Sequence, residues 1–515
     1  MNEIVLFYPR PWPGTTMSGR LPYSLMFLYS YLKNADIKVK IIDQRTEVDL
    51  DATIKKFKKN ILCFGISSFT GVQIKGGLEI SKKIKEFHPE VPIVWGGWHP
   101  TSMPEQTLRH PFVDIVVRGQ GEVTLKELAV ALSCDRDLSN IKGISFKKQG
   151  KIYHNPCREL LSLIEEVKMP FEAVDVEKYI YKKPFADRSD RSIGIITSLG
   201  CPNNCAFCEV ASVYKRHIFF RNMDNILEEI EFLVSKYKIT GITIDDDNFF
   251  VSRKRVVQFC EELNKRPYKI SWDAGVSVNL ILAKYDDETL KLVKKSGCKQ
   301  LYIGAESGSN LTLERLNKKA TVEQTYEFVN KMKKIGIRAS FSSMVGVHGV
   351  PESEVFETMD MILKCREINP DFDFRLFYYT PYPSTSLYGE AIKHGFKEPE
   401  SLEAWSDHTL RKFKAPWFKK SYRNQVKYFY FYYFPYSGTL NSAPTDTSLW
   451  GKSLDLFCSI FFDNFILKKI AKWRVKKRFF KYPIDAIYAI QGRRLKSLYG
   501  KIIYNNVDVF YEFDN

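Results

Sequence analysis

Cysteines and long apolar runs are both scarce in this sequence. Ten cysteines in 515 residues are too few for a disulfide-stabilised fold. No stretch reaches the roughly 18 uninterrupted apolar residues that a membrane-spanning helix needs. The first residues, MNEIVLFYPRPW, have no basic segment ahead of an apolar core, so we expect no secretory signal. Together these absences predict a cytoplasmic protein whose thiols stay reduced.

Repeats and low-complexity linkers are also missing, and the composition is that of a globular protein, with 44% hydrophobic and 27% charged residues. The length exceeds what one hydrophobic core usually supports, so two or three domains are expected. Positive charge is concentrated near the C-terminus. Residues 411–501 contain 20 lysines and arginines but only four carboxylates, and the whole chain has a net charge of +17. The charge therefore describes one region rather than the whole protein.

Residues 1–135 alternate short apolar runs with helix-length amphipathic stretches, which predicts an α/β domain with a doubly wound, Rossmann-like parallel sheet. The GxGxxG dinucleotide pattern is absent. Ligands of such sheets bind at the carboxyl ends of the strands. Residues 136–190 are expected to form a connector that includes a small hairpin. The predicted strands are Ile4–Tyr8, Val39–Asp43, Ile61–Ser67, Val91–Trp95 and Ile115–Arg118.

The alternation of strands and helices resumes over residues 191–400 and predicts a partial (β/α)6 barrel of the TIM type. Thr321 and Gln324 form a candidate capping box before one of its helices. Residues 401–515 lose this alternation and are expected to form a mostly helical, basic and aromatic region. The predicted barrel strands are Ile193–Ser198, Gly241–Asp245, Ile270–Val276, Gln300–Ala305, Arg338–Val345 and Phe374–Thr380.

Three cysteines stand together after the first barrel strand. Cys201, Cys205 and Cys208 occur in SLGCPNNCAFCEV with C-x3-C-x2-C spacing. A [4Fe-4S] cluster normally takes four thiolates, so three leave one iron open to another ligand. Zinc would need a fourth cysteine or histidine at short spacing, and His217 lies nine residues beyond Cys208. The motif predicts an iron-sulfur cluster with one open iron.

With Phe207 beside the last cysteine, this motif resembles that of the radical S-adenosylmethionine (SAM) superfamily. Residues 1–400 are similar to the branch that carries an N-terminal cobalamin-binding domain. The resemblance implies that the open iron binds the amino and carboxylate groups of SAM, and that reduction produces a 5′-deoxyadenosyl radical that abstracts hydrogen from the substrate. The other segments that carry it are VVRGQGEVT, ITIDDDNFF, YIGAESGS, GVHGVPES and TPYPSTSLY.

The resemblance also suggests which residues bind SAM. It places Asp245, Asp246 and Asp247 near the methionine ammonium and Glu306 with Ser307 near the ribose. Phe207 and Arg338 complete the predicted SAM site. The alternatives are a solvated acidic turn, a helix-capping Glu-Ser pair and a surface arginine. The chain departs from the family pattern where HGV is inserted before Pro351 and where Ser384 replaces a glycine.

The cobalamin prediction rests on loops, because the D-x-H-x-x-G pattern that supplies a histidine to cobalt is absent. His99 occurs in GGWHPT, in the corresponding region but without the aspartate. In this branch the histidine is commonly lacking, and loops hold the corrin instead. A domain that binds no corrin remains the alternative. The predicted cobalamin-site residues are Ser67, Ser68, Gly96, Gly97, His99, Gly119 and Glu122.

The leading function that the resemblance implies is cobalamin-dependent methylation of an unactivated carbon. The alternatives are a radical cyclase or rearrangement enzyme, a tRNA-modifying methylthiotransferase, and a non-catalytic cobalamin or redox sensor. Only Cys63 and Cys134 offer cysteines in the first domain, where methylthiotransferases carry three. The expected partners are a small-molecule or lipid-like substrate and an electron donor such as flavodoxin or ferredoxin.

The C-terminal region interleaves basic residues with the aromatic runs Phe429–Phe434 and Phe461–Phe465. Such dense runs favour peripheral contact with a membrane over nucleic acid, whose bases stack on single aromatic side chains. The alternative is a packed domain with a solvated basic face.

Overall fold

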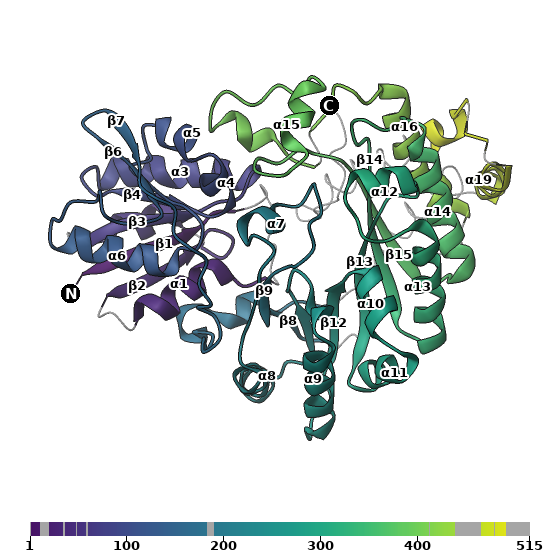
Figure 1. The fold of residues 1–515 in the computed structure, drawn as a ribbon, viewed down its shortest axis with the longest axis horizontal. Helices are drawn as coiled ribbons and strands as arrows, with labels where there is room; N and C mark the ends of the chain where they lie inside the picture. The colour runs from purple at the N-terminus through teal and green to yellow at the C-terminus, as the bar shows by residue number, and fades with distance from the viewer. Residues whose placement is uncertain are drawn as a thin grey trace, which may run out of the picture.

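A computed structural model describes most of the chain. The described residues are 2–10, 20–33, 37–47, 49–57, 60–182, 190–410, 413–437, 465–477, 479–480 and 482–490. Figure 1 shows two α/β bodies lying side by side, with α7 (Glu209–Val213) between them and α19 (Phe465–Lys477) at the end of the molecule opposite the N-terminal body.

The N-terminal body is built on a sheet in the order β2-β1-β3-β4-β5-β6-β7. Its first five strands are parallel, and the hairpin of β6 and β7 adds antiparallel strands next to β5. All five predicted strands and the hairpin are present, so the doubly wound prediction is confirmed. The bounds are β1 (Glu3–Tyr8), β2 (Lys38–Asp43), β3 (Ile61–Ser67), β4 (Ile93–Gly96), β5 (Ile115–Val117), β6 (Ile144–Lys148) and β7 (Lys151–His154).

Both faces of this sheet are buried. Alternate residues of β1 enter separate cores: Val5 and Phe7 pack on one side and Ile4 and Leu6 on the other. The helices that cover the sheet include α1 (Tyr23–Lys33), α3 (Val72–Phe87) and α6 (Glu122–Ser133). With both faces filled, a ligand has room only at the strand ends. In this strand order the crevice lies where the connections diverge, between β1 and β3.

The second body is a six-stranded parallel sheet in the order β15-β14-β13-β12-β11-β8. The edge strands β8 and β15, both fully described, do not pair with each other, so the barrel is open. The six predicted strands are confirmed, as is the Thr321–Gln324 capping box. The bounds are β8 (Ser192–Ile195), β11 (Gly241–Ile244), β12 (Ser271–Val276), β13 (Cys298–Glu306), β14 (Arg338–Val345) and β15 (Phe372–Tyr378).

The two faces of the barrel sheet differ in polarity. Ile242, Trp272 and Leu301 belong to the outer core, under helices such as α8 (Met223–Tyr237), α9 (Arg253–Lys265), α13 (Val322–Ile335) and α14 (Glu354–Ile368). The residues between them face the opposite side of the sheet, where most of the side chains are polar. A closed TIM barrel fills its interior with Val, Ile and Leu, whereas this inner face suits polar ligands. The inward-facing residues include Thr243, Asp273, Gln300, Tyr302, Ser340, Ser342, Asp373 and Arg375.

The aromatic run of the C-terminal region packs against the barrel. It lies in α16 (Lys420–Tyr428), η5 (Phe429–Tyr433) and α17 (Phe434–Ser437). Phe429 and Tyr432 are fully buried, and the rings of Phe434 and Phe374 have centroids 4.4 Å apart. The expectation that this run faces a membrane is therefore wrong, because the outer face of β15 needs an apolar cover. The second run, Phe461–Phe465, falls outside the described side chains.

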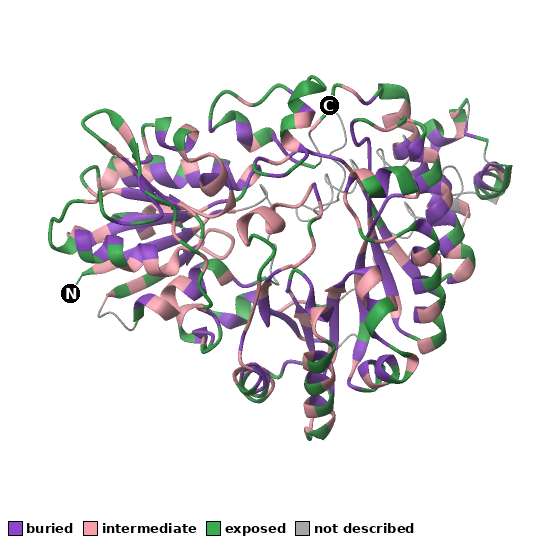
Figure 2. Ribbon diagram, in the orientation of Figure 1, coloured by how far each residue is buried: buried purple, intermediate pink, exposed green. Residues whose placement is uncertain are grey.

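Figure 2 shows buried residues concentrated on the strands of both sheets and exposed residues on the outer faces of the helices. Within the described part of the chain, no helix is both long and apolar enough to cross a bilayer.

Candidate active site between the two α/β bodies

The three-cysteine loop follows β9 (Ser198–Gly200) and ends at α7. It leaves the carboxyl end of the first barrel strand, the edge at which TIM-type barrels place their chemistry. Cys201, Cys205 and Cys208 are unpaired by disulfides and only partly buried. The loop therefore presents three accessible thiols at the mouth of the barrel.

The protein itself fixes the conformation of this loop. The Asp247 carboxylate accepts a 2.9 Å hydrogen bond from the Gly200 amide, and the Asn317 side chain donates to the Asn204 carbonyl at 2.6 Å. Phe207, predicted to contact SAM, packs on an apolar cluster below the loop. These contacts preorganise the cysteines for a cofactor.

A [4Fe-4S] cluster fits this donor set. The cube binds each thiolate to a different iron, so its cysteines surround it rather than converge on one point. Burial raises the pKa of all three thiols, that of Cys208 to about 12. Positively charged iron would favour the thiolates.

Asn248 and Ser277 support the loop from below, and sequence reasoning did not single them out. The Asn248 amide donates to the Ser277 hydroxyl at 2.9 Å and lies 3.9 Å from the Cys201 sulfur. Asn248 is 1% exposed, and its carbonyl oxygen has no hydrogen-bond partner among the described atoms. A buried orphan acceptor next to a cluster thiol indicates a ligand with a donor group at this point. Its position directly after Asp245–Asp247 was the available signal.

Glu306 lies at the end of β13 in the left-handed region, with φ of 62°. Its carboxylate forms a 2.9 Å ion pair with the Lys318 ammonium, and both side chains are at least nine-tenths buried. Burial alone lowers the pKa of Lys318, but Glu306, Cys205 and Cys208 together hold it above the usual value. A buried cation thus lies next to both the predicted ribose ligand and the cluster thiols. No sequence pattern identified Lys318.

The three consecutive aspartates have separate roles. Asp245 accepts from the Tyr23 hydroxyl at 3.0 Å and pairs with Arg20 at 3.2 Å, both from the N-terminal body. Asp246 is buried and accepts from the amide and hydroxyl of Thr197. Only Asp247 acts on the cysteine loop. Asp245 and Asp246 are thus bonded within the fold, and the assignment of the three aspartates to the methionine ammonium stays a prediction.

Two further residues of the predicted SAM site make other contacts within the barrel. Ser307 is fully buried, and its hydroxyl contacts Glu354 and Thr358 of α14 at 3.2 Å. Arg338 is the first residue of β14 and pairs with Asp371 at 3.3 Å. It therefore lies at the amino end of its strand, away from the catalytic edge. Ser307 therefore joins the end of β13 to α14, and Arg338 joins the start of β14 to Asp371, just before β15.

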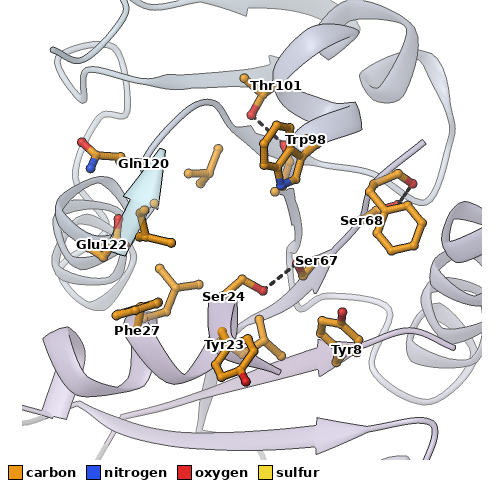
Figure 3. A pocket seen from close by; sticks show the side chains of 18 of the residues that line it. Tyr8, Tyr23, Ser24, Phe27, Ser67, Ser68, Trp98, Thr101, Gln120 and Glu122 are labelled. Carbon is orange, nitrogen blue, oxygen red and sulfur yellow. Dashed lines mark hydrogen bonds between the residues drawn. The ribbon is translucent and has the colours of Figure 1, made fainter. Parts of the chain in front are cut away.

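A cavity of about 380 Å³ lies between the two bodies, at the carboxyl edge of the N-terminal sheet. Figure 3 shows Ser24, Ser67, Gln120 and Glu122 around it. Six of the seven predicted cobalamin residues line it, namely Ser67, Ser68, Gly96, Gly97, Gly119 and Glu122. The barrel contributes Ile196, Ser198, Leu199, Val213, Tyr214, Asp245 and Asp247 to the opposite wall.

The cavity wall suits a corrin, which has apolar faces and amide-bearing edges. One buried oxygen of Glu122 has no hydrogen-bond partner among the described atoms, and burial raises the pKa of this carboxyl. The position where a side chain would start at Gly119 is open space. Thr101 ties the loops together by donating to the Gly97 carbonyl and accepting from the Gly119 amide at 3.0 Å. These residues fit a large ligand held by loops.

His99, the seventh prediction, does not line this cavity. Its ring contacts Thr70 at 3.1 Å and packs on Trp405, 5.3 Å between centroids. Burial lowers its pKa to about 3, so it is neutral. His99 and Pro100 are both buried residues of a short helix, α4 (Trp98–Ser102). No histidine is found among the described residues that line the cavity.

The two bodies are joined by side chains that frame the cavity. Trp98 meets Tyr214, the residue that follows α7, with ring centroids 6.3 Å apart. Ser102 donates a 3.1 Å hydrogen bond to Ser384, which has a left-handed φ of 65°. A left-handed φ is the conformation that glycine adopts most easily, and glycine is the residue of the family pattern that Ser384 replaces. The contacts place the cluster loop against the loops of the N-terminal sheet.

Comparison with known proteins gives the same two-part organisation. The family model of the B12 binding domain matches residues 21–129, and that of the Radical SAM superfamily matches residues 195–362. An uncharacterised methyltransferase of Pyrococcus horikoshii is 33% identical over 378 residues, 72% of this chain and 78% of that protein. The anaerobic magnesium-protoporphyrin IX monomethyl ester cyclase of Rubrivivax gelatinosus is 30% identical over 313 residues, 59% of this chain and 54% of that protein.

Solved structures share the fold. The cobalamin-dependent SAM radical enzyme OxsB, with aqua-cobalamin and SAM bound, aligns with a TM-score of 0.70 at 19% identity, covering 98% of this chain and 75% of that one. The radical SAM methyltransferase TsrM of Kitasatospora setae, with cobalamin and a [4Fe-4S] cluster, has a TM-score of 0.61 at 18% identity, covering 78% and 76%. The cofactors of this family are a [4Fe-4S] cluster, SAM and cobalamin. This chain belongs to the radical SAM superfamily, in the branch whose members join a B12-binding domain to the radical SAM barrel.

Proposed function

We propose that this enzyme transfers a methyl group from cobalamin to an unactivated carbon of a small substrate. One observation carries the proposal: a single cavity is walled on one side by Ser67, Gly119 and Glu122 and on the other by Tyr214 and Asp247 of the barrel. A corrin held in that cavity would lie on the side from which the cluster loop leaves the barrel, because Ser198 and Leu199 of β9 and Val213 of α7, the elements that flank the loop, line the wall. The methyl donor and the radical source therefore act on the same substrate position.

When bound, the cluster and SAM supply a 5′-deoxyadenosyl radical, and cobalamin supplies a transferable methyl group. The chain contributes the positions of these groups. Cys201, Cys205 and Cys208 hold the cluster, and the buried Lys318–Glu306 pair fixes a charged contact near the thiols. The aromatic contact between Trp98 and Tyr214 adds two rings to the cavity wall, and excluding water there would protect a carbon radical from side reactions.

The polar inner face of the barrel indicates the substrate's route. Asp273, Tyr302 and Arg375 lie along neighbouring inward positions, so we infer that the substrate carries polar groups. Reduction needs an electron donor, and we propose a flavodoxin or ferredoxin of the cytoplasm for this step. Cys63 is buried and Cys134 is exposed, which gives no support to the additional cysteine site of methylthiotransferases.

A cyclase is the second candidate, because three relatives are named anaerobic magnesium-protoporphyrin IX monomethyl ester cyclases. The two candidates differ in the product. With SAM that carries a deuterated methyl group, the methyltransferase gives a product heavier by one labelled methyl group. A cyclase gives an unlabelled product that has lost hydrogen.

The cavity can be tested without the substrate. Replacing Ser67 by Trp places a large side chain in the corrin cavity, away from the cysteine loop. We expect anaerobically reconstituted Ser67→Trp to lose bound cobalamin while keeping its iron, sulfide and 5′-deoxyadenosine formation. Ser235→Trp, on the exposed face of α8, is the matched control and should keep all of them. Wild-type corrin content in Ser67→Trp would refute the proposed cavity.

A further inference from the structure

The segment around residues 466–488 carries an unusual number of exposed apolar side chains. Of fifteen large hydrophobic side chains exposed in the described residues, seven belong to this short segment. They are Ile466, Trp473, Phe479, Tyr482, Ile484, Ile487 and Tyr488, with exposed fractions between 37% and 76%. We call this the C-terminal surface. Patches of this kind on a folded protein mark contact sites.

Among the described residues of this surface, the exposed charged side chains are all basic. Residues 465–490 contain eight lysines and arginines and one acidic residue, Asp485. The Asp485 carboxylate turns inward and pairs with Arg474 at 2.9 Å, and both side chains are about nine-tenths buried. Lys472, Lys476 and Lys477 are exposed. The outward charge is therefore basic.

Arg474 also makes the surface rigid. Its guanidinium donates to the carbonyls of Phe479, at 3.2 Å, and Tyr482, at 2.9 Å, which joins α19 to the short helix at 484–490. On the inner side, the Tyr432 hydroxyl donates to the Leu467 carbonyl at 3.0 Å. Phe480 packs in the aromatic cluster beside the barrel. The inner positions are filled, so the exposed apolar side chains cannot fold inward.

The spacing aligns the exposed groups. Ile466 and Trp473 are seven residues apart and share one side of α19, while Ile484, Ile487 and Tyr488 follow helical i, i+3, i+4 spacing. Lysines flank the apolar stripe on α19. This is the arrangement of helices that lie in the plane of a membrane interface, with apolar side chains among the acyl chains and lysines at anionic headgroups.

We propose that the C-terminal surface docks this enzyme on anionic lipid bilayers. Three of its seven exposed apolar residues are isoleucines, which have no ring to stack on bases, so the composition favours lipid over nucleic acid. Figure 1 places α19 at the end of the molecule opposite the N-terminal body. Docking there leaves the cofactor cavity accessible, and the inference does not depend on the proposed reaction.

Vesicle co-sedimentation of the full-length, anaerobically reconstituted protein tests this surface. We expect binding to vesicles that contain phosphatidylglycerol, weak binding to pure phosphatidylcholine, and loss of binding at high salt. Replacing Lys472, Lys476 and Lys477 together by Gln should weaken binding roughly a hundredfold. The matched control replaces the exposed Lys254, Lys291 and Lys295 of α9 and α11 (Asp287–Lys295) by Gln and should bind like wild type.

Insertion has its own readout, because brominated lipids quench tryptophan fluorescence at short range. Trp473→Phe should bind as wild type but lose most of the quenching. The double variant Ile484→Ser/Ile487→Ser should bind weakly while keeping the wild-type melting temperature. The proposal is overturned if the lysine variant binds like wild type, if neutral vesicles bind equally well, or if RNA competes away all vesicle binding.

Discussion

The two parallel sheets of this enzyme differ in the burial and polarity of their faces. In the N-terminal sheet, Val5 and Phe7 fill one core and Ile4 and Leu6 fill another, so both faces are closed. In the barrel, the outer face is apolar, while Thr243, Asp273 and Tyr302 give the inner face polar character. One sheet can hold a ligand only at its edge, and the other can admit one inside.

This difference separates the two cofactor sites. The N-terminal sheet would hold cobalamin with loops that contain glycines, such as Gly96, Gly97 and Gly119. The barrel would hold the cluster and SAM with thiols and a buried ion pair. The edge of one meets the mouth of the other at a single cavity. A change on one side should therefore leave the second cofactor in place, and the predictions below test that independence.

The largest effect is expected from removing a cluster ligand. Cys201→Ala should lower 5′-deoxyadenosine formation by about a hundredfold or more, since loss of even a supporting residue near a metal costs 10- to 100-fold. Bound cobalamin should stay near the wild-type amount, because the N-terminal loops are untouched. Cys134→Ala, an exposed cysteine of the first body, is the control and should change neither quantity. Loss of corrin in Cys201→Ala would contradict the separation of the two sites.

A second large effect is expected at the buried pair beside the cluster. Lys318→Met leaves the Glu306 carboxylate buried without its cation and should destabilise the protein by about 3–5 kcal/mol. Adding Glu306→Gln removes that charge and should restore most of the melting temperature. SAM cleavage should stay at least about tenfold slow in the double variant, measured as 5′-deoxyadenosine per cluster. If the double variant recovered both its stability and its full rate of SAM cleavage, the ion pair would have a structural role only.

The sequence predicted the strands and the cluster loop better than the individual ligand residues. Short apolar runs between helix-length amphipathic stretches located all eleven principal strands, and C-x3-C-x2-C spacing identified the cluster loop. The individual SAM ligands were harder. Asp245 was assigned to SAM, but it faces Arg20, which lies over 200 residues away in sequence and is brought near only by docking of the two bodies. Lys318 and Asn248 were missed because burial and orphaned atoms depend on tertiary packing.

A smaller effect, a pH-dependent change in unfolding free energy, is expected at Glu354. This residue of α14 lies at the catalytic edge of the barrel. Its carboxylate accepts from the Gly346 amide at 2.9 Å, and burial raises its pKa from 4.5 to about 7. A raised carboxyl pKa contributes stability below pH 4.5 that is lost as the pH rises toward 7. Relative to Glu354→Gln, wild type should therefore lose up to about 3 kcal/mol over that range.

Chemical denaturation at several pH values measures this difference. Other buried carboxyls titrate in both proteins and cancel in the comparison. A gap between Glu354→Gln and wild type that stays constant from pH 4.5 to 7 would show that Glu354 ionises normally.

The smallest effect is expected at the seam between the two bodies. Ser384→Gly relieves the left-handed backbone strain but removes the hydrogen bond to Ser102. These terms are similar in size, so the change in unfolding free energy should stay within about 1 kcal/mol. Ser384→Ala keeps the strain and loses the bond, and it should be the less stable of the two by thermal melting. The reverse order would mean that φ at this position is not strained.

Cobalamin bound in the cavity between the two bodies is expected to lie near the cluster. Electron paramagnetic resonance of the anaerobically reduced holoenzyme tests this directly. The signal of cobalt(II) in cobalamin broadens when the unpaired spin of a reduced [4Fe-4S] cluster lies nearby. We predict a broadened cobalt signal in wild type and a sharp one in the Cys201→Ala/Cys205→Ala/Cys208→Ala variant, which keeps the corrin but lacks the cluster. Identical, unbroadened cobalt signals in the two proteins, each with full corrin content, would contradict the shared cavity.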